Sequence, residues 1–153
     1  MTVSACLRLP LRGEIPVDRV IEVAKRVAEA NPYEVAFADT IGVGVPSQVT
    51  EILGRAREAL PGVRLRAHFH NTRNTGLANA YAAVEAGVSA LDSSAGGIGG
   101  CPFAPAATGN IPTEDLVYML HRMGVSTGID LEKLLATASG CNKLSVAMCL
   151  ACC

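Results

Sequence analysis

The pattern of apolar and polar residues switches repeatedly between short apolar runs and longer stretches with helical spacing. Short runs rich in β-branched residues predict strands, and apolar residues three or four positions apart predict amphipathic helices. The predicted strands cover residues 2–6, 34–38, 63–67 and 88–91, and the predicted helices cover 17–28, 46–60, 75–86 and 112–123. The pattern therefore predicts four strand–helix units.

Proline and glycine mark the ends of these predicted helices. A proline suits the first turn of a helix, and a glycine suits the position after its last turn. The residues that give these signals are Pro16, Pro46, Pro61, Gly62, Gly87, Pro112 and Gly124. One extra helix is predicted over residues 130–138, where Leu131, Leu134 and Leu135 share a face, and the pattern degrades after Ser139.

Strands that alternate with helices predict an α/β fold with a parallel sheet and right-handed crossovers. The sheet is either open or an arc of a (β/α)8 barrel. A complete barrel needs about 250 residues, whereas this chain has 153. An arc of four strands leaves two strand edges that another half must cover. We expect one domain over residues 1–138 and an atypical, cysteine-containing tail over 139–153.

Composition narrows the classes of function. Half of the residues are hydrophobic, 18% are charged and the formal net charge is -1. Without a basic surplus or a Lys/Arg run, nucleic acid is not an expected partner. No apolar stretch approaches the ~20 residues of a membrane span, and the first residues lack the regions of a secretory signal. We expect a soluble, cytoplasmic protein that is not bound to a membrane.

The six cysteines are not spaced like a disulfide framework. Cys6 and Cys101 are isolated, and the other four crowd the C-terminus at Cys141, Cys149, Cys152 and Cys153. The C-x-x-C-C run could bind a soft metal, but no second cysteine pair or nearby histidine completes four ligands. The other interpretation is an apolar tail.

Polar residues cluster where the predicted strands end. Asp39 follows the second strand, His68 and His70 end the third, and residues 92–110 follow the fourth. Parallel α/β folds assemble their active sites at the carboxyl ends of the strands. Position therefore favours a functional site here.

His68 and His70 are the sharpest candidates for chemistry. Residues two apart on a strand point to the same side, so both imidazoles can meet one ion, although a single strand histidine is more often structural. Asn110 can add an amide oxygen, or it can cap the helix that follows. Nitrogen and oxygen ligands together suit Mn2+, Mg2+, Fe2+ or Co2+ about as well as Zn2+.

A glycine-rich loop follows the fourth predicted strand. Residues 96–100 contain four glycines, which makes the loop a candidate mobile flap rather than a dinucleotide fingerprint. Cys101 at its tip could be a general acid or base, a nucleophile or an inert thiol.

The sequence pattern allows more than one role for Asp39 and for three arginines. Asp39 could hold a metal-bound water, orient a ligand or cap its loop. Arg64, Arg66 and Arg73 are either solvated charges or groups that face an anion.

The chain resembles the hydroxymethylglutaryl-CoA lyases of the DRE-TIM metallolyase superfamily over residues 4–138. The resemblance is carried by four runs in order: ADTIGVG, AHFHNTRNTGLANAYAAVEAGV, LDSSAGGIGGCPFAPAATGN and TEDLVYML. It implies that His68, His70 and Asn110 are metal ligands, that Cys101 is the catalytic cysteine on the flap and that Asp39 is an active-site carboxylate.

The resemblance also implies the reaction, which is cleavage of 3-hydroxy-3-methylglutaryl-CoA to acetyl-CoA and acetoacetate, as in leucine degradation and ketone body formation. A divalent cation, Mg2+ or Mn2+, would make the tertiary hydroxyl of the substrate easier to deprotonate. Alternatives within enzymes are another aldolase or an acyl-CoA condensing enzyme of the superfamily, but the Gly-Gly-Cys-Pro loop argues against both.

The chain departs from the family pattern at its start. The first barrel strand of the family carries an arginine and a metal-binding aspartate, and no such R-D-G segment occurs here. We therefore expect the C-terminal half of a TIM barrel, whose partner is a missing N-terminal half or a second copy of itself. The isolated chain is expected to be inactive or nearly so. A catalytically inactive half-barrel subunit is the alternative outside enzymes.

Overall fold

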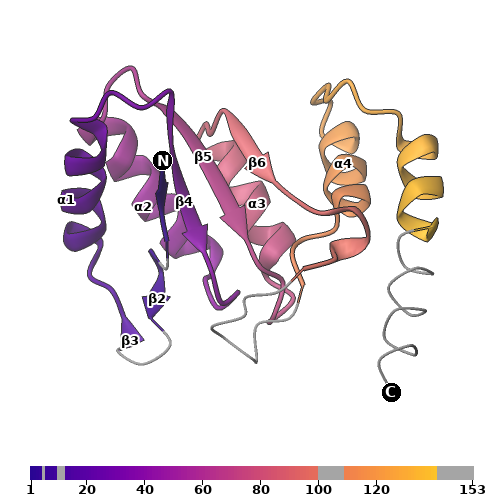
Figure 1. Ribbon diagram of the computed structural model, residues 1–153, viewed down its shortest axis with the longest axis horizontal. Helices are drawn as coiled ribbons and strands as arrows, with labels where there is room; N and C mark the ends of the chain where they lie inside the picture. The colour runs from indigo at the N-terminus through magenta and orange to yellow at the C-terminus, as the bar shows by residue number, and fades with distance from the viewer. Residues whose placement is uncertain (5, 10–12, 100–108, 141–153) are drawn as a thin grey trace.

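A four-stranded parallel sheet forms the centre of the fold (Figure 1). The computed structural model describes residues 1–4, 6–9, 13–99 and 109–140. The sheet strands are β1 (Thr2–Val3), β4 (Glu34–Asp39), β5 (Arg64–Phe69) and β6 (Ala90–Asp92), and they lie side by side in chain order. Every neighbouring pair is parallel. The predicted α/β class and parallel sheet are confirmed.

Each sheet strand is followed by an α-helix, and a short 3-10 helix, η1 (Ala95–Gly97), lies between β6 and the last of them. These α-helices are α1 (Val17–Ala28), α2 (Pro46–Ala59), α3 (Gly76–Glu85) and α4 (Thr113–Arg122), close to the predicted bounds. Pro46 begins α2 as expected, but Pro16 and Pro112 lie one position outside their helices, because their ψ angles of 134° and 133° are extended. The predicted last helix is present as helical backbone over residues 131–140.

The first strand differs most from its prediction. The expected strand at residues 2–6 pairs regularly with β4 only at Thr2–Val3, although the Cys6 N–H still donates to the Ala38 carbonyl at 3.2 Å. A small antiparallel hairpin of β2 (Arg8–Leu9) and β3 (Gly13–Glu14) follows and was not predicted. Strands of two residues are too short to produce a recognisable alternation of apolar and polar side chains.

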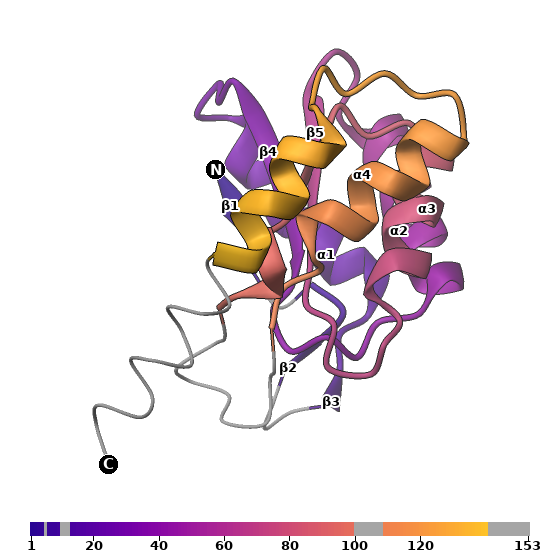
Figure 2. The same cartoon turned by 90° about the vertical axis from the view of Figure 1, so that its right-hand side faces the viewer.

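The hydrophobic core lies between the sheet and the helices that cover one of its faces. Figure 2 shows α2 and α3 on the same side of the strands. In β5 the buried residues alternate, with Leu65, Ala67 and Phe69 in the core. Leu53 of α2 packs against this face with 1% of its surface exposed. The intervening β5 side chains therefore point to the opposite face, which carries the polar residues.

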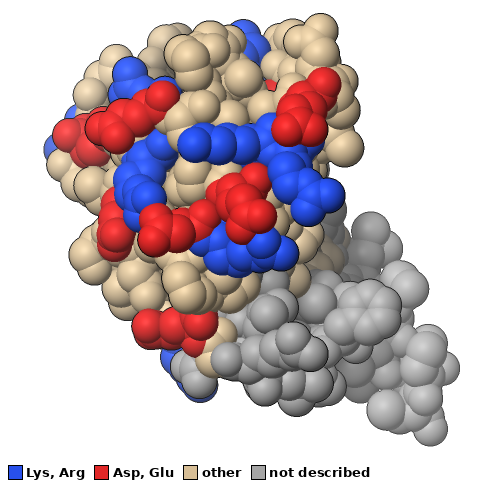
Figure 3. Space-filling view, turned by 90° about the vertical axis from the view of Figure 1, so that its left-hand side faces the viewer, with Lys and Arg blue, Asp and Glu red and all other residues tan. Residues whose placement is uncertain are grey.

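Mixed charge covers the face of the molecule on which α1 lies (Figure 3). Arg19 pairs with Glu22 along α1, and Asp18 of α1 pairs with Arg55 of α2. Acidic and basic side chains alternate on this face rather than forming a patch of one sign. Among the described residues, no helix is long and apolar enough to cross a bilayer.

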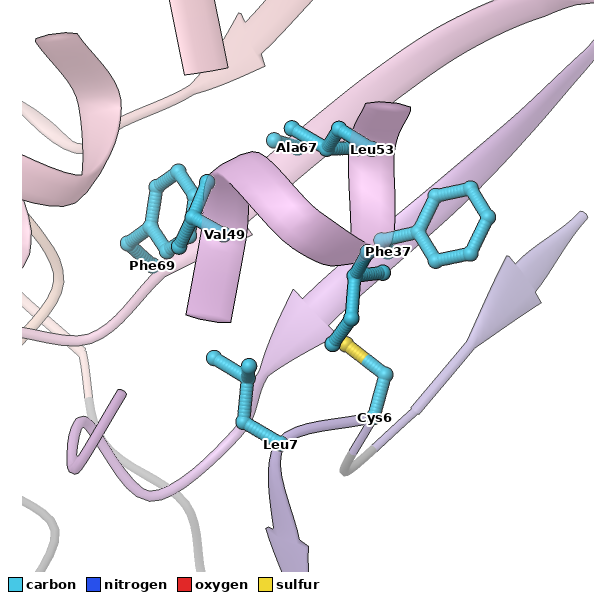
Figure 4. A pocket seen from close by; sticks show the side chains of 8 residues that line it. Cys6, Leu7, Phe37, Val49, Leu53, Ala67 and Phe69 are labelled. Atoms are coloured by element: carbon cyan, nitrogen blue, oxygen red, sulfur yellow. The ribbon is translucent and has the colours of Figure 1, made fainter. Parts of the chain in front are cut away.

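Cys6 is buried in a small apolar gap between the sheet and α2 (Figure 4). Its thiol donates to the Ala38 carbonyl at 3.3 Å. Burial, with a smaller effect of the nearby Asp39 charge, raises the pKa of Cys6 from 9.0 to about 12. The thiol is therefore protonated and inaccessible at neutral pH.

We expect Cys6 to resist alkylation by iodoacetamide in the folded chain and to react once the chain is unfolded, as peptide mass mapping would show. The pKa of the Cys6 thiol is higher in the folded chain than in the unfolded chain. The buried, protonated thiol therefore contributes to folding stability below pH 9.0, and this contribution is lost as the pH rises towards about 12. Rapid labelling of Cys6 under native conditions would contradict this burial.

Candidate metal centre

Two histidine side chains meet at the carboxyl end of β5. Because Ala67 and Phe69 face the helices, His68 and His70 point to the other side of the sheet. Their ring centroids lie 5.1 Å apart, with the ring planes at 71°. The structure thus places both imidazoles together, as the spacing of two residues predicted.

Asn110 is brought to the same place by backbone pairing. His70 and Asn110 form an antiparallel bridge. The flanking bonds run from Asn71 N–H to the Gly109 carbonyl at 3.0 Å and from Ile111 N–H to the Phe69 carbonyl at 3.3 Å. Residues 40 positions apart in the chain therefore lie side by side at the end of β5.

Two atoms at this site are buried without a hydrogen-bond partner in the described part of the chain. They are Nδ1 of His70 and Oδ1 of Asn110. Leaving such a group unpaired costs about 1–3 kcal/mol, so a partner for either atom from outside the described residues is favoured. An imidazole nitrogen and an amide oxygen are donors for divalent cations. The predicted ligand set therefore fits a divalent ion.

The surroundings of His68 also suit a metal-binding role for its imidazole. Burial, followed by the neighbouring His70, lowers the pKa of His68, against opposing effects of Asp92 and Asp39. The neutral imidazole, which is the form that binds metal, is therefore favoured. No cluster of three His, Cys, Asp or Glu side chains able to hold a metal occurs among the described residues. The predicted set pairs two histidines with an amide, so it is not a cluster of that kind.

Asn110 does not act as the helix cap that the sequence left open. Pro112 occupies the N-cap of α4, and no side chain of a described residue caps that helix. The Asn110 side chain instead donates from Nδ2 to the Ile98 carbonyl at 3.1 Å. Gly99 has φ +121, and a Cβ there would lie 2.6 Å from Asn110 Nδ2. The described part of the glycine loop therefore packs directly against Asn110.

Asp39 holds the loop that follows β4. It is 1% exposed, and its carboxylate accepts hydrogen bonds from the backbone N–H groups of Val43 at 3.3 Å and Gly44 at 2.8 Å. These contacts match the capping alternative. The predicted catalytic role of Asp39 stays a prediction.

Replacing Asp39 by asparagine is expected to lower the free energy of unfolding by about 1–3 kcal/mol. The reason is that Asn has one acceptor oxygen, so it cannot serve both loop N–H groups with the strength of a carboxylate. Urea denaturation would measure the change, with the exposed Asp115→Asn as the matched control. Equal stability of the two variants would exclude the capping role.

Sequence reasoning missed a row of ion pairs beside the histidines. Arg66 contacts Glu34 at 2.5 Å and Asp92 at 2.9 Å, and His68 Nδ1 lies 3.6 Å from Asp92 Oδ2. The sequence left Arg66 as solvated or anion-facing, and it faces two carboxylates. The alternation along β5 placed Arg66 on the same side as His68, but the neighbours on β4 and β6 depend on strand register.

Of the other residues singled out from the sequence, the structure describes some and not others. Arg64 lies over the Tyr33 ring, 5.1 Å from its centroid. The predicted catalytic Cys101 and the cysteines at Cys141, Cys149, Cys152 and Cys153 lie outside the described residues. Their proposed roles therefore stay predictions.

Comparison with known proteins identifies one family and several similar lyases. A family profile described as HMGL-like matches residues 3–140. The chain is 43% identical over 138 residues to (R)-citramalyl-CoA lyase of Chloroflexus aurantiacus, an alignment that covers 90% of this chain and 44% of that protein. It is 42% identical over 144 residues to the mitochondrial hydroxymethylglutaryl-CoA lyase of Gallus gallus, covering 94% and 48%.

Solved structures agree with the sequence comparison. An HMG-CoA lyase from Acinetobacter baumannii, in complex with coenzyme A and 3-methylmalate, superposes with a TM-score of 0.85 at 39% identity. The match covers 90% of this chain and 45% of that one. The chain spans about half the length of the relatives it matches. It belongs to the HMGL-like family, and its parallel sheet is part of the TIM-barrel fold of that family.

Proposed function

We propose that the protein is a divalent-metal-dependent carbon–carbon lyase that cleaves 3-hydroxy-3-methylglutaryl-CoA to acetyl-CoA and acetoacetate. The observation that carries this proposal is the meeting of His68, His70 and Asn110 at the end of β5. Two of their side-chain atoms, one nitrogen and one oxygen, are buried without a hydrogen-bond partner in the part of the chain that the structure describes. The similarity to acyl-CoA lyases supports the substrate class.

His68, His70 and Asn110 would hold Mg2+ or Mn2+. The ion, when bound, would lower the pKa of the tertiary hydroxyl of the substrate. Loss of that proton allows the C2–C3 bond to break, and the electron pair stays on C2 as the enolate of acetyl-CoA. An acid must then protonate C2, and Cys101 is our candidate for that group. The solved relative with coenzyme A supports an acyl-CoA ligand.

We further propose that the chain corresponds to the C-terminal half of the barrel. The sheet ends at β1 on one side and at β6 on the other within the described residues, and a closed barrel of this type needs eight strands. An N-terminal half, or a second copy of the chain, would complete it, and the isolated chain is expected to be inactive. The proposed location is the cytoplasm, which imaging of the tagged protein in its host would test.

A second candidate substrate is citramalyl-CoA. The similarity to (R)-citramalyl-CoA lyase, at 43% identity, is as strong as the similarity to the hydroxymethylglutaryl-CoA lyase. Both names describe lyases of acyl-CoA substrates, so the same metal site would serve either reaction. The choice of substrate is therefore part of the test.

The experiment measures cleavage of both acyl-CoA substrates with Mn2+ or Mg2+, first by this chain alone and then by the chain mixed with the separately expressed N-terminal half of a related lyase. Activity on 3-hydroxy-3-methylglutaryl-CoA that requires mixing, and that His70→Ala or Cys101→Ala removes, would support the proposal. Cleavage of citramalyl-CoA alone would favour the second candidate. No cleavage by an assembled, metal-loaded mixture would refute both.

A further inference from the structure

A row of four charged or titratable side chains crosses three strands on the histidine face of the sheet. It runs from Glu34 on β4, through Arg66 on β5, to Asp92 on β6 and back to His68 on β5. Arg66 Nη2 lies 2.5 Å from Glu34 Oε1, and Arg66 Nη1 lies 2.9 Å from Asp92 Oδ1. The other oxygen of Asp92, Oδ2, lies 3.6 Å from Nδ1 of His68.

Strand register explains why Arg66 can reach both carboxylates. Arg66 lies opposite Ala36 of β4 and Ala90 of β6, whereas Asp92 lies opposite His68. The two small alanines leave room beside Arg66, so its guanidinium can run diagonally to a carboxylate on each neighbouring strand. A planar guanidinium that pairs through both Nη atoms is restrained in orientation. Arg66 in turn fixes the Asp92 carboxylate beside His68.

The two oxygens of Asp92 therefore have separate partners. Oδ1 accepts from Arg66 at 2.9 Å, and Oδ2 faces the imidazole of His68. A neutral imidazole carries one proton, and a carboxylate beside Nδ1 favours the tautomer that keeps the proton on Nδ1. The lone pair of that tautomer lies on Nε2, which is then the nitrogen free to bind a cation.

We propose that Asp92 is a positioning residue for His68: it selects the Nδ1–H tautomer and so presents Nε2 to the divalent ion, while Glu34 and Arg66 hold Asp92 in place. This inference rests on the proposed metal site. Carboxylates that orient metal-binding histidines are a general feature of such centres, and their removal typically weakens metal binding by about 10–100-fold. Asp92 need not touch the ion or the substrate for this role.

The test uses the whole chain with 15N-labelled histidine. Two-bond 1H–15N spectra of the metal-free chain report which ring nitrogen of His68 carries the proton, and a Mn2+ titration followed by electron paramagnetic resonance reports affinity. The variants are Asp92→Ala, Asp92→Asn as the closer match in shape, and Asp115→Ala as an exposed aspartate control. Circular dichroism confirms that each variant is folded.

The expected result is an Nδ1–H tautomer of His68 in the unaltered chain and in Asp115→Ala, and a shift towards Nε2–H in Asp92→Ala. Mn2+ affinity should fall by about 10–100-fold in Asp92→Ala, and by less in Asp92→Asn. A His68 tautomer that is Nε2–H from the start, or that is unchanged in folded Asp92 variants, would overturn the proposal. An Nδ1–H tautomer in a chain that binds no Mn2+ would support the contact but overturn the proposed metal site.

Discussion

Replacing His70 by leucine is expected to abolish Mn2+ binding without lowering the thermal stability of the metal-free chain. His70 is 5% exposed, and its Nδ1 is buried without a hydrogen-bond partner among the described residues. In the metal-free chain that unpaired atom costs about 1–3 kcal/mol. Leucine has a similar volume and no polar atom in its side chain, so it removes this cost.

The same His70→Leu substitution is expected to weaken Mn2+ binding, in contrast to its effect on thermal stability. Loss of an orienting partner weakens metal sites by about 10–100-fold, and loss of a direct ligand is expected to exceed the upper end of that range. A Mn2+ titration would measure the affinity, and circular dichroism on heating would measure the thermal midpoint. The pair of results is more informative than either alone, because a general loss of structure would reduce both.

His121 offers a matched control for this experiment. It is an exposed histidine at the end of α4, and its ring Nε2 lies 2.9 Å from Thr127 Oγ1. His121→Leu should leave Mn2+ affinity unchanged. If His70→Leu bound Mn2+ as the unaltered chain does, the ion would have to bind elsewhere. If it melted at a clearly lower temperature, His70 would have a stabilising partner.

The sequence was sufficient to predict the longer elements because each of them carries a long periodic pattern of apolar residues. α1, α2, β4 and β5 carry patterns of six to fourteen residues. The hairpin of β2 and β3 has two residues in each strand, and its pairing depends on contacts rather than on a periodic pattern. Pro46 begins α2 as predicted, whereas Pro16, expected in the first turn of α1, precedes the helix and adopts an extended conformation.

The site was predictable to the extent that it depends on one strand. The placement of His68 and His70 together follows from the alternation of side chains along β5. The contact with Asn110 depends on a backbone bridge between distant segments. The residue pattern left Asn110 as an amide ligand or a helix cap and the family resemblance implied the ligand, but neither predicted the bridge. The pairs of Arg66 with Glu34 and Asp92 depend on the register of three strands, and register is set by packing across the whole sheet.

The largest loss of stability is expected from Leu53→Ala. Leu53 is 1% exposed in α2, and it lines the apolar gap with Phe37 of β4 and Ala67 of β5 (Figure 4). Truncating a buried leucine costs about 2–5 kcal/mol, and the cost is highest where the surroundings cannot collapse. Here the neighbours belong to a helix and two paired strands, and a gap is already present. We expect a value in the upper half of that range.

Such a loss would be a large part of the total, because domains are stabilised by only about 5–15 kcal/mol. Urea denaturation would measure it, with Leu135→Ala as the control, since Leu135 is 48% exposed and its truncation should cost less than about 0.5 kcal/mol. A cost for Leu53→Ala close to that of the control would mean that the layer between α2 and the sheet is loosely packed in the isolated chain. Tight packing there would instead depend on the proposed N-terminal half, because that half would restrain the strands from the opposite face. The difference between the two leucine variants, measured with and without the added N-terminal half, therefore separates a half-barrel that folds by itself from one whose core forms only on assembly.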